Sequence, residues 1–458
     1  MRDAQEAACQ LSGAFAGIAP GDIVHRRAIR GRAAILLPAL DDMGRRVTGT
    51  SDHARAIRLI ALVCAAQVLV QIGAFFWPAL LPQMIPRWSL TNSEAGWITA
   101  AFYGAYIFAV PVLVTLTDRI DAKLVYLSGV AITVAGHALF AALADGFWSA
   151  LAARALTGVG WAGTYMTGLK LLADIVDGKL LSRAATGHAA SIGISGALSF
   201  ACADLLSGIG GWRFAFHVAA ASAAVAFAIV WLAAPRRAVR PKPAAGAPAL
   251  FDFRPVLRNR SAMAYAIAYG LHTLEMSALR GWGVAFLASV AVGTGAASIV
   301  SPTTALTVLG LIGTAASVAG NEAAIRFGRR TLIAAAMMGS AALAGLLAVA
   351  GAQSYPLAVA LMLIYGAVIW LDSASLTAGT AGTAEPSRRG ATLAVHSTLG
   401  YLGGFIGPLA VGLALDLGGG NTAAGWSGAF AMIAALMALA LVTFLAMRPR
   451  GLAGDRGA

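Results

Sequence analysis

Apolar stretches of about 20 residues recur along the chain from Leu59 onward, separated by short polar connections. A helix of that length crosses the roughly 30 Å hydrocarbon core of a bilayer, because each residue rises about 1.5 Å. The pattern predicts an all-α integral membrane protein with twelve transmembrane helices. The predicted spans are 59–80, 95–116, 124–143, 148–172, 186–207, 214–233, 262–285, 300–319, 331–351, 356–380, 391–415 and 426–447.

The composition favours the same class of protein. Hydrophobic residues make up 59% of the 458 positions and charged residues 12%, whereas soluble domains average about 45–50% and about 25%. The three cysteines, Cys9, Cys64 and Cys202, are far apart and indicate neither a disulfide framework nor a metal site. We therefore expect a protein that is not a water-soluble globule and that binds no cofactor and no metal.

Positive charge is concentrated on one side of the predicted membrane topology. The 33 Lys and Arg residues lie mainly in the N-terminal segment, the even-numbered connections and the C-terminal tail, whereas the odd-numbered connections contain only Arg87 and Arg213. By the positive-inside rule, both termini are predicted to be cytoplasmic, in a bacterial-type inner membrane. The same distribution accounts for the net charge of +13, so no nucleic-acid partner is expected.

The twelve spans divide six and six at the longest charged connection, residues 234–260, which contains prolines and basic residues typical of a linker. This division predicts an N-terminal bundle over 56–233, a C-terminal bundle over 261–447 and a cytoplasmic tail over 448–458. Residues 1–55 are expected to be a cytoplasmic segment without a secretory signal. Alternatively, translation begins at Met43 and residues 1–42 are a miscalled extension.

An internal repeat relates the two halves. Three short motifs recur in chain order with offsets of 206, 207 and 214 residues, on either side of spans five and eleven. Such nearly constant spacing predicts that both halves share one topology. The motif pairs are Arg183-x-x-Thr186 with Arg389-x-x-Thr392, Gly193-x-x-Gly196 with Gly400-x-x-Gly403, and Gly211-Trp212 with Gly425-Trp426.

Further motifs resemble those of the major facilitator superfamily of secondary transporters. The fourth span contains Arg154-Ala155-Leu156-Thr157-Gly158-Val159-Gly160, which matches the family's Arg-x-x-x-Gly-x-Gly. The family's loop motif, Gly-x-x-x-Asp-Arg-x-Gly-Arg-Arg/Lys, is degraded to Asp118-Arg119 after span two. After span eight it keeps Arg326-Phe327-Gly328-Arg329-Arg330, but Ile325 stands in the place of the acid.

The resemblance covers residues 55–450 and implies two pseudo-symmetric six-helix bundles that rock about a central site near the midplane. Span five lacks the family's antiporter signature, and spans two and eight lack the arginines of the nitrate porters, so both subgroups are disfavoured. Small residues in the motifs are expected to allow close helix packing. The close-packing candidates are Gly158, Gly160, Gly193, Gly196, Gly403 and Gly407.

Span seven contains the largest number of ionisable residues. At 100° per residue, its polar side chains fall within an arc of about 140°. We predict Glu275 as the proton site and His272, one turn away, as its relay or partner. The alternative is a buried ion pair or hydrogen bond that only fixes helix packing. The residues on this arc are Tyr265, Tyr269, His272, Glu275, Met276 and Arg280.

Other spans supply further candidates for the substrate or proton pathway. Arg154 and Arg280 would make the cavity selective for anions, because their guanidinium groups suit carboxylate and phosphate oxygens. Alternatively, Arg154 only satisfies backbone carbonyls near the glycines. Each remaining candidate also has a packing alternative, and Asp204 is expected at the hydrated outer end of span five. The remaining candidates are Gln67, Gln71, Tyr103, Tyr106, Asp372 and His396.

Charged residues at the predicted cytoplasmic surface are too shallow for a central site. We predict that they form a gate of salt bridges that breaks when the cavity opens inward; alternatively, they only set the orientation. The gate residues are Asp118, Arg119, Arg326, Arg329 and Arg330. Separately, Thr91-x-x-Glu94 predicts a capping box at the start of span two.

The sequence therefore predicts a monomeric membrane transporter with no enzyme motif. Our first hypothesis is a proton-coupled secondary transporter, working by alternating access, for a small polar, anionic organic solute. A second is a proton-coupled exporter of amphipathic or cationic compounds, with Glu275 and Asp372 as counter-charges. A third is a transporter-like receptor or scaffold that transports nothing. The partners expected are the solute, the proton and the lipid bilayer.

Overall fold

A computed structural model describes residues 50–117, 119–176, 178–236, 253–295 and 300–456. Asp118, Met43 and most of the predicted linker lie outside the described residues. Contacts divide the chain into two units, residues 1–58 and 59–458, and the packing described below is that of the second unit, which contains α3 from Leu59 onward and all the later helices.

The described chain is helical, and it contains no strand among these residues. The first half contains α3 (Thr50–Gln71), α4 (Phe76–Arg87), α5 (Asn92–Leu116), α6 (Ala122–Leu143), α7 (Phe147–Ala162), α8 (Tyr165–Ala173) and α9 (Gly178–Ala233). The second half contains α10 (Arg254–Arg258), α11 (Arg260–Thr294), α12 (Pro302–Phe327), α13 (Arg329–Ala350), α14 (Tyr355–Leu371), α15 (Ser373–Thr383), a 3-10 turn (Pro386–Arg388), α16 (Arg389–Leu417) and α17 (Ala423–Met447).

These helices make twelve crossings of a membrane, as predicted. Ten helical segments of the described chain are long and apolar enough to span. One of them, Arg183–Ala233, has 51 residues and is broken at Gly210 and Gly211, so it crosses twice. Gly211 has a φ of +78°, which a residue with a side chain rarely adopts. The short helices α7 and α8, which meet at Thr164, together make the remaining crossing.

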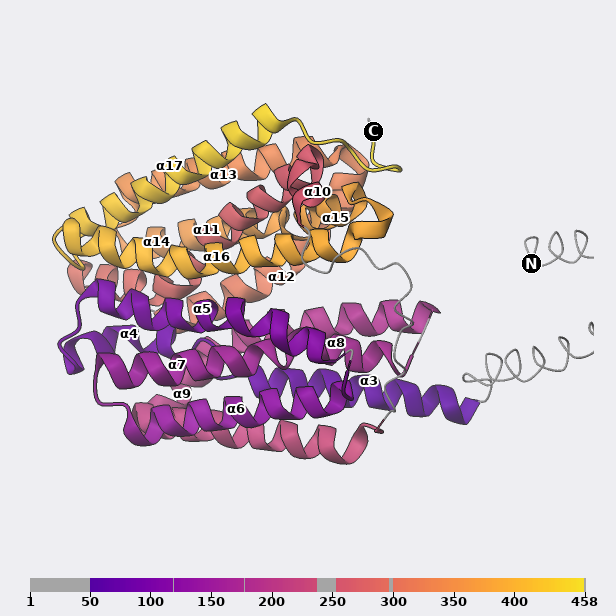
Figure 1. Ribbon diagram of the computed structural model, residues 1–458. Coiled ribbons are helices and arrows are strands. Elements are labelled where there is room, and N and C mark those ends of the chain that lie inside the picture. The colour runs from indigo at the N-terminus through magenta and orange to yellow at the C-terminus, as the bar shows by residue number, and fades with distance from the viewer. Residues whose placement is uncertain (1–49, 118, 177, 237–252, 296–299, 457–458) are drawn as a thin grey trace, which may run out of the picture. The chain divides into compact units, whose positions relative to one another are not determined.

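The internal repeat is visible in the helix pairing. In the first half α5 packs on α7 and α6 on α9; in the second half α12 packs on α14 and α13 on α17 (Figure 1). The capping box of Thr91 and Glu94 that the sequence predicts is present at the start of α5. The structure is therefore the all-α, two-bundle fold that the sequence predicts. We call α3 to α9 the N-bundle and α10 to α17 the C-bundle.

The predicted close-packing glycines lie at helix crossings. A Cβ atom at Gly158 would overlap the Phe102 carbonyl of α5, and one at Gly403 would overlap the Gly270 carbonyl of α11. Gly160 and Gly407 contact neighbours within their own bundles in the same way. Gly193 instead faces Thr314 of the C-bundle. A Cβ atom at Gly196 would contact the Phe75 ring and lie 3.9 Å from Arg280 of the C-bundle.

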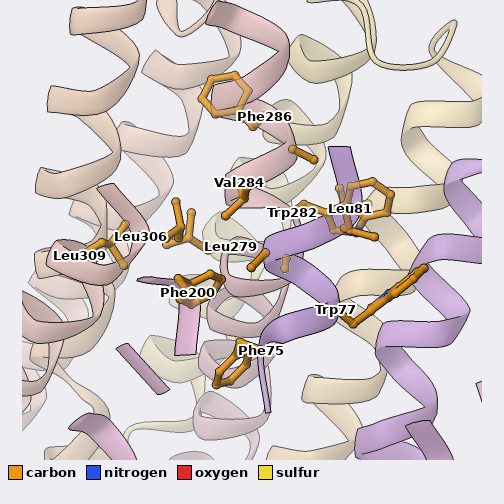
Figure 2. Close-up of a cluster of buried hydrophobic side chains, with 14 of the residues drawn as sticks. Phe75, Trp77, Leu81, Phe200, Leu279, Trp282, Val284, Phe286, Leu306 and Leu309 are labelled. Carbon is orange, nitrogen blue, oxygen red and sulfur yellow. The ribbon is translucent and has the colours of Figure 1, made fainter. Parts of the chain in front are cut away.

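The two bundles are joined most tightly at one end, which we call the closed end: the end where α5 begins and α16 ends. There α4 packs on α11, α5 on α16 and α9 on α12. Figure 2 shows an apolar cluster to which both bundles contribute, with Phe75, Trp77 and Leu81 from the N-bundle and Leu279 and Trp282 from the C-bundle. The opposite end contains the last residues of α17 and residues 448–456, and we call it the tail end. There α8 packs against α5, α6, α7 and α9, and α15 packs against α11, α12, α13, α14 and α16, all within their own bundles.

Candidate functional site

Arg280 of α11 lies between the two bundles. Its guanidinium carbon is 5.1 Å from the ring centroid of Phe75 in the N-bundle and 4.8 Å from that of Trp370 in the C-bundle. Among the described residues, no hydrogen bond and no carboxylate neutralises this half-buried cation. The aromatic faces stabilise the charge in part, but they leave its hydrogen-bond donors available for a ligand.

Arg154 of α7 is the second central cation, and it is only 2% exposed. Its Nη2 donates to the Ala74 carbonyl over 3.1 Å, and its guanidinium lies 4.6 Å from the centre of the Phe102 ring. Its Nε and Nη1 have no partner among the described residues. The bond to Ala74 agrees with the structural alternative for Arg154, whereas the two unused donors favour an anion nearby.

Gln67 and Gln71 are both buried in the N-bundle. The Oε1 of Gln67 accepts from the Tyr126 hydroxyl over 3.3 Å, and neither amide nitrogen has an acceptor within the described chain. Gln71 lines a small cavity together with His137 and Trp161, whose Nδ1 and Nε1 also have no described partner. Three polar side-chain atoms around this cavity therefore have no hydrogen-bond partner among the described residues.

Four predicted residues of the C-bundle form one polar cluster. His272 Nδ1 lies 2.9 Å from Asp372 Oδ1, and these side chains are 1% and 4% exposed. The ring of Tyr269 stacks on that of His396 at 3.9 Å and lies 5.8 Å from that of His272. His396 is held by the hydroxyls of Thr377 and Thr380 on α15, at 3.2 and 3.0 Å. The cluster thus ties α11, α15 and α16 together around a His-Asp pair.

Glu275 makes its hydrogen bonds outside this cluster, so the residues on the arc predicted for span seven have different partners, and its role as the proton site stays a prediction. Its Oε1 accepts hydrogen bonds from Tyr365 of α14 at 2.7 Å and from Ser340 of α13 at 2.8 Å. It also lines a cavity inside the C-bundle with Trp282 and Trp426. An arc of about 140° on a surrounded helix faces several neighbours, so residues on it separate into different environments.

Tyr265, which lies inside the same arc near the start of α11, also has a partner outside the cluster. Tyr265 donates its hydroxyl to the Arg450 carbonyl in the C-terminal tail over 2.8 Å. On the N-bundle side, Tyr106 stacks on Tyr401 of α16 at 3.7 Å, and Trp161 lies 5.6 Å from the same ring. Tyr106 therefore contributes to contact between the bundles, at a position between the closed end and the tail end.

The family model described as Major Facilitator Superfamily matches residues 63–318, which are more than half of the chain. The chain belongs to the major facilitator superfamily. That family consists of membrane transporters rather than enzymes, as the motifs predict. Among the described residues, no group of three His, Cys, Asp or Glu side chains could hold a metal ion.

Curated relatives of this superfamily member include spinster proteins. Human protein spinster homolog 1 is 25% identical over 255 residues, which cover 53% of this chain and 47% of that protein. The bovine protein is 24% identical over 265 residues, covering 55% and 49%. The matched region thus spans about half the length of these curated relatives.

Solved structures of low sequence identity share the fold. A bacterial homologue of the human lysosomal transporter Spinster, in an inward-facing and occupied conformation, has a TM-score of 0.71 at 15% identity and covers 85% of this chain and 96% of that one. The nucleoside transporter NupG has a TM-score of 0.65 at 16% identity, covering 85% and 98%. The human organic anion transporter MFSD10 has a TM-score of 0.61 at 17% identity, covering 85% and 99%.

The loop motif after α12 makes contacts within its own bundle in this superfamily member. Arg329 is 3% exposed and forms a two-pronged ion pair with Asp455 of the C-terminal tail, at 2.9 and 3.0 Å. Arg326 pairs with Glu322 on its own helix over 3.0 Å. Arg119 and Arg330 are exposed. Asp118 lies outside the described residues, so the salt-bridge gate across the bundles stays a prediction.

Sequence reasoning missed Asp455 and Asp416, and it placed Asp204 at the outer end of span five without a partner. Asp455 was not considered, although the acid missing at Ile325 is a signal that another acid takes its place. Asp416 of α16 accepts hydrogen bonds from the start of α5, and Asp204 of α9 accepts one from α12. The repeat offset could have linked these two acids, because they are 212 residues apart.

Proposed function

We propose that the chain is a secondary transporter that moves a small anionic organic solute by alternating access, coupled to protons. The observation that supports this best is the pair Arg154 and Arg280, which have no carboxylate partner among the described residues. A charge inside a membrane protein is costly unless it is paired. A carboxylate or phosphate group of the solute would supply the missing counter-charge, and the arginine fork would orient it.

The bundle contacts support an inward-facing state for this proposal. The bundles are joined at the closed end, whereas α8 and α15 pack within their own bundles at the tail end. The distribution of lysines and arginines along the chain favours an orientation in which the tail end faces the cytoplasm, in a bacterial-type inner membrane. The solute would then leave Arg280 toward the cytoplasm. One chain contains both bundles, so a monomer would suffice.

For proton coupling we propose the His272-Asp372 pair in place of Glu275. The pair lies beside Tyr269 and His396 on helices that must move relative to the N-bundle. A proton taken up by the pair would neutralise Asp372 or charge His272, and thereby change the potential around the solute anion. Glu275 stays a second candidate, because its hydrogen bonds to Ser340 and Tyr365 connect it to the C-bundle interior.

The decisive experiment is binding and counterflow with purified protein. A panel of monocarboxylates, dicarboxylates, organic phosphates and lipophilic cations is tested for thermal stabilisation; a ligand at 100 times its Kd adds about 2.7 kcal/mol. We expect stabilisation by an anion that is lost in Arg280→Gln and partly kept in Arg280→Lys. Arg87→Gln, which changes an exposed arginine at the end of α4, is the matched control.

The same ligand is then used in proteoliposomes. Asp372→Asn should abolish accumulation driven by a proton gradient but preserve counterflow, because exchange needs no net proton movement. Absence of counterflow for every ligand that binds would contradict transport and favour the receptor or scaffold hypothesis. Unchanged proton-driven accumulation in Asp372→Asn would move the proton site to Glu275.

A second candidate function is supported by the cavity beside Glu275. Four aromatic residues of α11 and α17 line it, and Trp426 Nε1 has no acceptor among the described residues. Aromatic faces with a carboxyl group suit an amphipathic cation. In the same panel, stabilisation by lipophilic cations alone, lost in Glu275→Gln, would favour this candidate over the anion transporter. The aromatic residues are Trp282, Phe286, Trp426 and Phe430.

A further inference from the structure

Asp416 reaches from the last turn of α16 in the C-bundle to the first turn of α5 in the N-bundle. Its Oδ1 accepts from the backbone N of Asn92 at 3.0 Å and from Asn92 Nδ2 at 2.8 Å, and its Oδ2 accepts from the backbone N of Ser93 at 2.8 Å. The first backbone N–H groups of a helix have no partner within the helix, and the positive end of the helix dipole attracts an anion. A carboxylate of one bundle therefore caps a helix of the other.

A second carboxylate makes the corresponding contact in the other direction. Asp204, in the part of α9 that precedes the break at Gly210, accepts from the Thr303 hydroxyl over 2.7 Å. Thr303 lies in the first turn of α12, whose own N-cap, Ser301, already accepts from the backbone N of Thr304. Among the described residues, Asp204 accepts one hydrogen bond, from a side chain, whereas Asp416 accepts three, two of them from backbone N–H groups.

The internal repeat relates these two contacts. Asp204 and Asp416 are 212 residues apart, and their partners Asn92 and Thr303 are 211 apart, within the range of offsets found in the sequence motifs. The helix crossings beside them repeat too. A Cβ atom at Gly96 would lie 2.8 Å from the Pro408 carbonyl, and one at Gly310 would lie 2.9 Å from the Ala197 Cβ. Two copies of one structural device therefore join the bundles at the closed end.

We infer that Asp204 and Asp416 are repeat-related latches that hold the closed end shut and release when it opens. The inference rests on the two-state cycle of the proposed function. Opening this end must separate α5 from α16 and α9 from α12, and both carboxylates then exchange their protein partners for water. Asp416 is the stronger latch because it satisfies two backbone N–H groups in addition to a side chain.

The test measures the distance between the bundles at the closed end directly. Spin labels are placed at the exposed positions Arg87 of α4 and Gln353, which follows α13, in a chain whose three cysteines have been replaced. Losing a helix cap changes an equilibrium about fivefold. We expect Asp416→Asn to raise the ratio of long to short distances by about that factor, Asp204→Asn to raise it less, and Asp416→Glu to restore it in part.

The matched control is Asp145→Asn. Asp145 follows α6 at the same end, but it accepts from Ser149 within its own bundle over 2.7 Å, so its replacement should leave the distances unchanged. Asn92→Ala removes the partner instead of the acid, and it should act like Asp416→Asn even if that variant folds poorly. Unchanged distances in both Asn92→Ala and Asp416→Asn would overturn the latch. A shift in distances without any counterflow would leave the latch standing and contradict transport.

Discussion

The two ends of the molecule use charged side chains in opposite ways. At the closed end, the exposed Asp416 and Asp204 bind across the bundle interface to groups at helix starts. At the tail end, buried charges bind within one bundle, as Arg329 does with Asp455. Exposed hydrogen bonds are easily exchanged for hydrogen bonds to water. A buried charge that loses its partner stays uncompensated, which costs several kcal/mol of stability. The contacts that would break in the proposed cycle are therefore exposed, whereas the contact between Arg329 and Asp455 within one bundle is buried.

At the tail end, equivalent residues of the two repeats can be compared. Lys123 at the start of α6 and Arg329 at the start of α13 are 206 residues apart and occupy equivalent places. Lys123 Nζ donates to the carbonyls of Trp231 and Ala234, at the end of α9, over 2.7 and 2.6 Å. Arg329 binds Asp455 beyond the end of α17 instead. Both residues tie the start of one helix to the end of the sixth crossing of their bundle or to the chain just beyond it.

The largest effect is expected from Asp455→Ala. Among the described residues, it leaves the buried Arg329 with only Asn321 and the Ser375 carbonyl as hydrogen-bond partners. Breaking a buried pair by removing one partner costs about 3–5 kcal/mol. Heat denaturation of the detergent-purified protein should show a large fall in the unfolding midpoint, whereas spin-label distances at the closed end should stay unchanged.

Two controls sharpen this result. Arg326→Ala removes an exposed pair within one helix turn, which is worth only about 0.3–0.5 kcal/mol. Combining Asp455→Ala with Arg329→Met removes both charges and should recover part of the lost stability. Equal losses in Asp455→Ala and Arg326→Ala would show that the Arg329 pair is not a stabilising contact of the tail end.

A smaller loss is expected from Lys123→Met, which keeps the apolar stem but removes the ammonium group. Two carbonyls lose their charged donor, and a hydrogen bond to a charged group contributes about 1.5–3 kcal/mol. Because Trp231 and Ala234 are in the N-bundle, the loss should appear in the unfolding of that bundle, measured by hydrogen exchange of α6 and α9. Lys170→Met, which changes a half-exposed lysine paired with Asp174, should have little effect. Similar exchange in both variants would contradict the role of Lys123.

The fold was largely predictable from the sequence, because span length and charge distribution are local properties. The boundaries were less so. The first crossing continues to Arg87 through Pro82 and Pro86, seven residues beyond the predicted end. The break between spans five and six was expected as a connection of six residues, but only Gly210 and Gly211 depart from helical geometry.

The candidate site was predictable by residue type but not by partner. Tyr269 and His272 were predicted on one arc of span seven, but nothing in the sequence joined Asp372 and His396 to them. Glu275 was placed with His272 because a helical wheel contains no information about neighbouring helices. Asp455 lies 126 residues after Arg329, and contacts over such separations depend on how the bundle closes. The repeat is the one long-range signal that the sequence itself contains.

The smallest effect, and the sharpest test of the difference between the ends, is expected from Gly96→Ala. The new methyl group would meet the Pro408 carbonyl only while the bundles are joined at the closed end. Overpacking of about 1 kcal/mol against that state should raise the long spin-label distances without lowering the unfolding midpoint. Gly403→Ala is the matched control, because its methyl group would meet the Gly270 carbonyl inside the C-bundle in every state. That variant should lower the midpoint and leave the distances unchanged. If both variants behave alike, the closed end is as permanent as the bundle interiors, and it does not open.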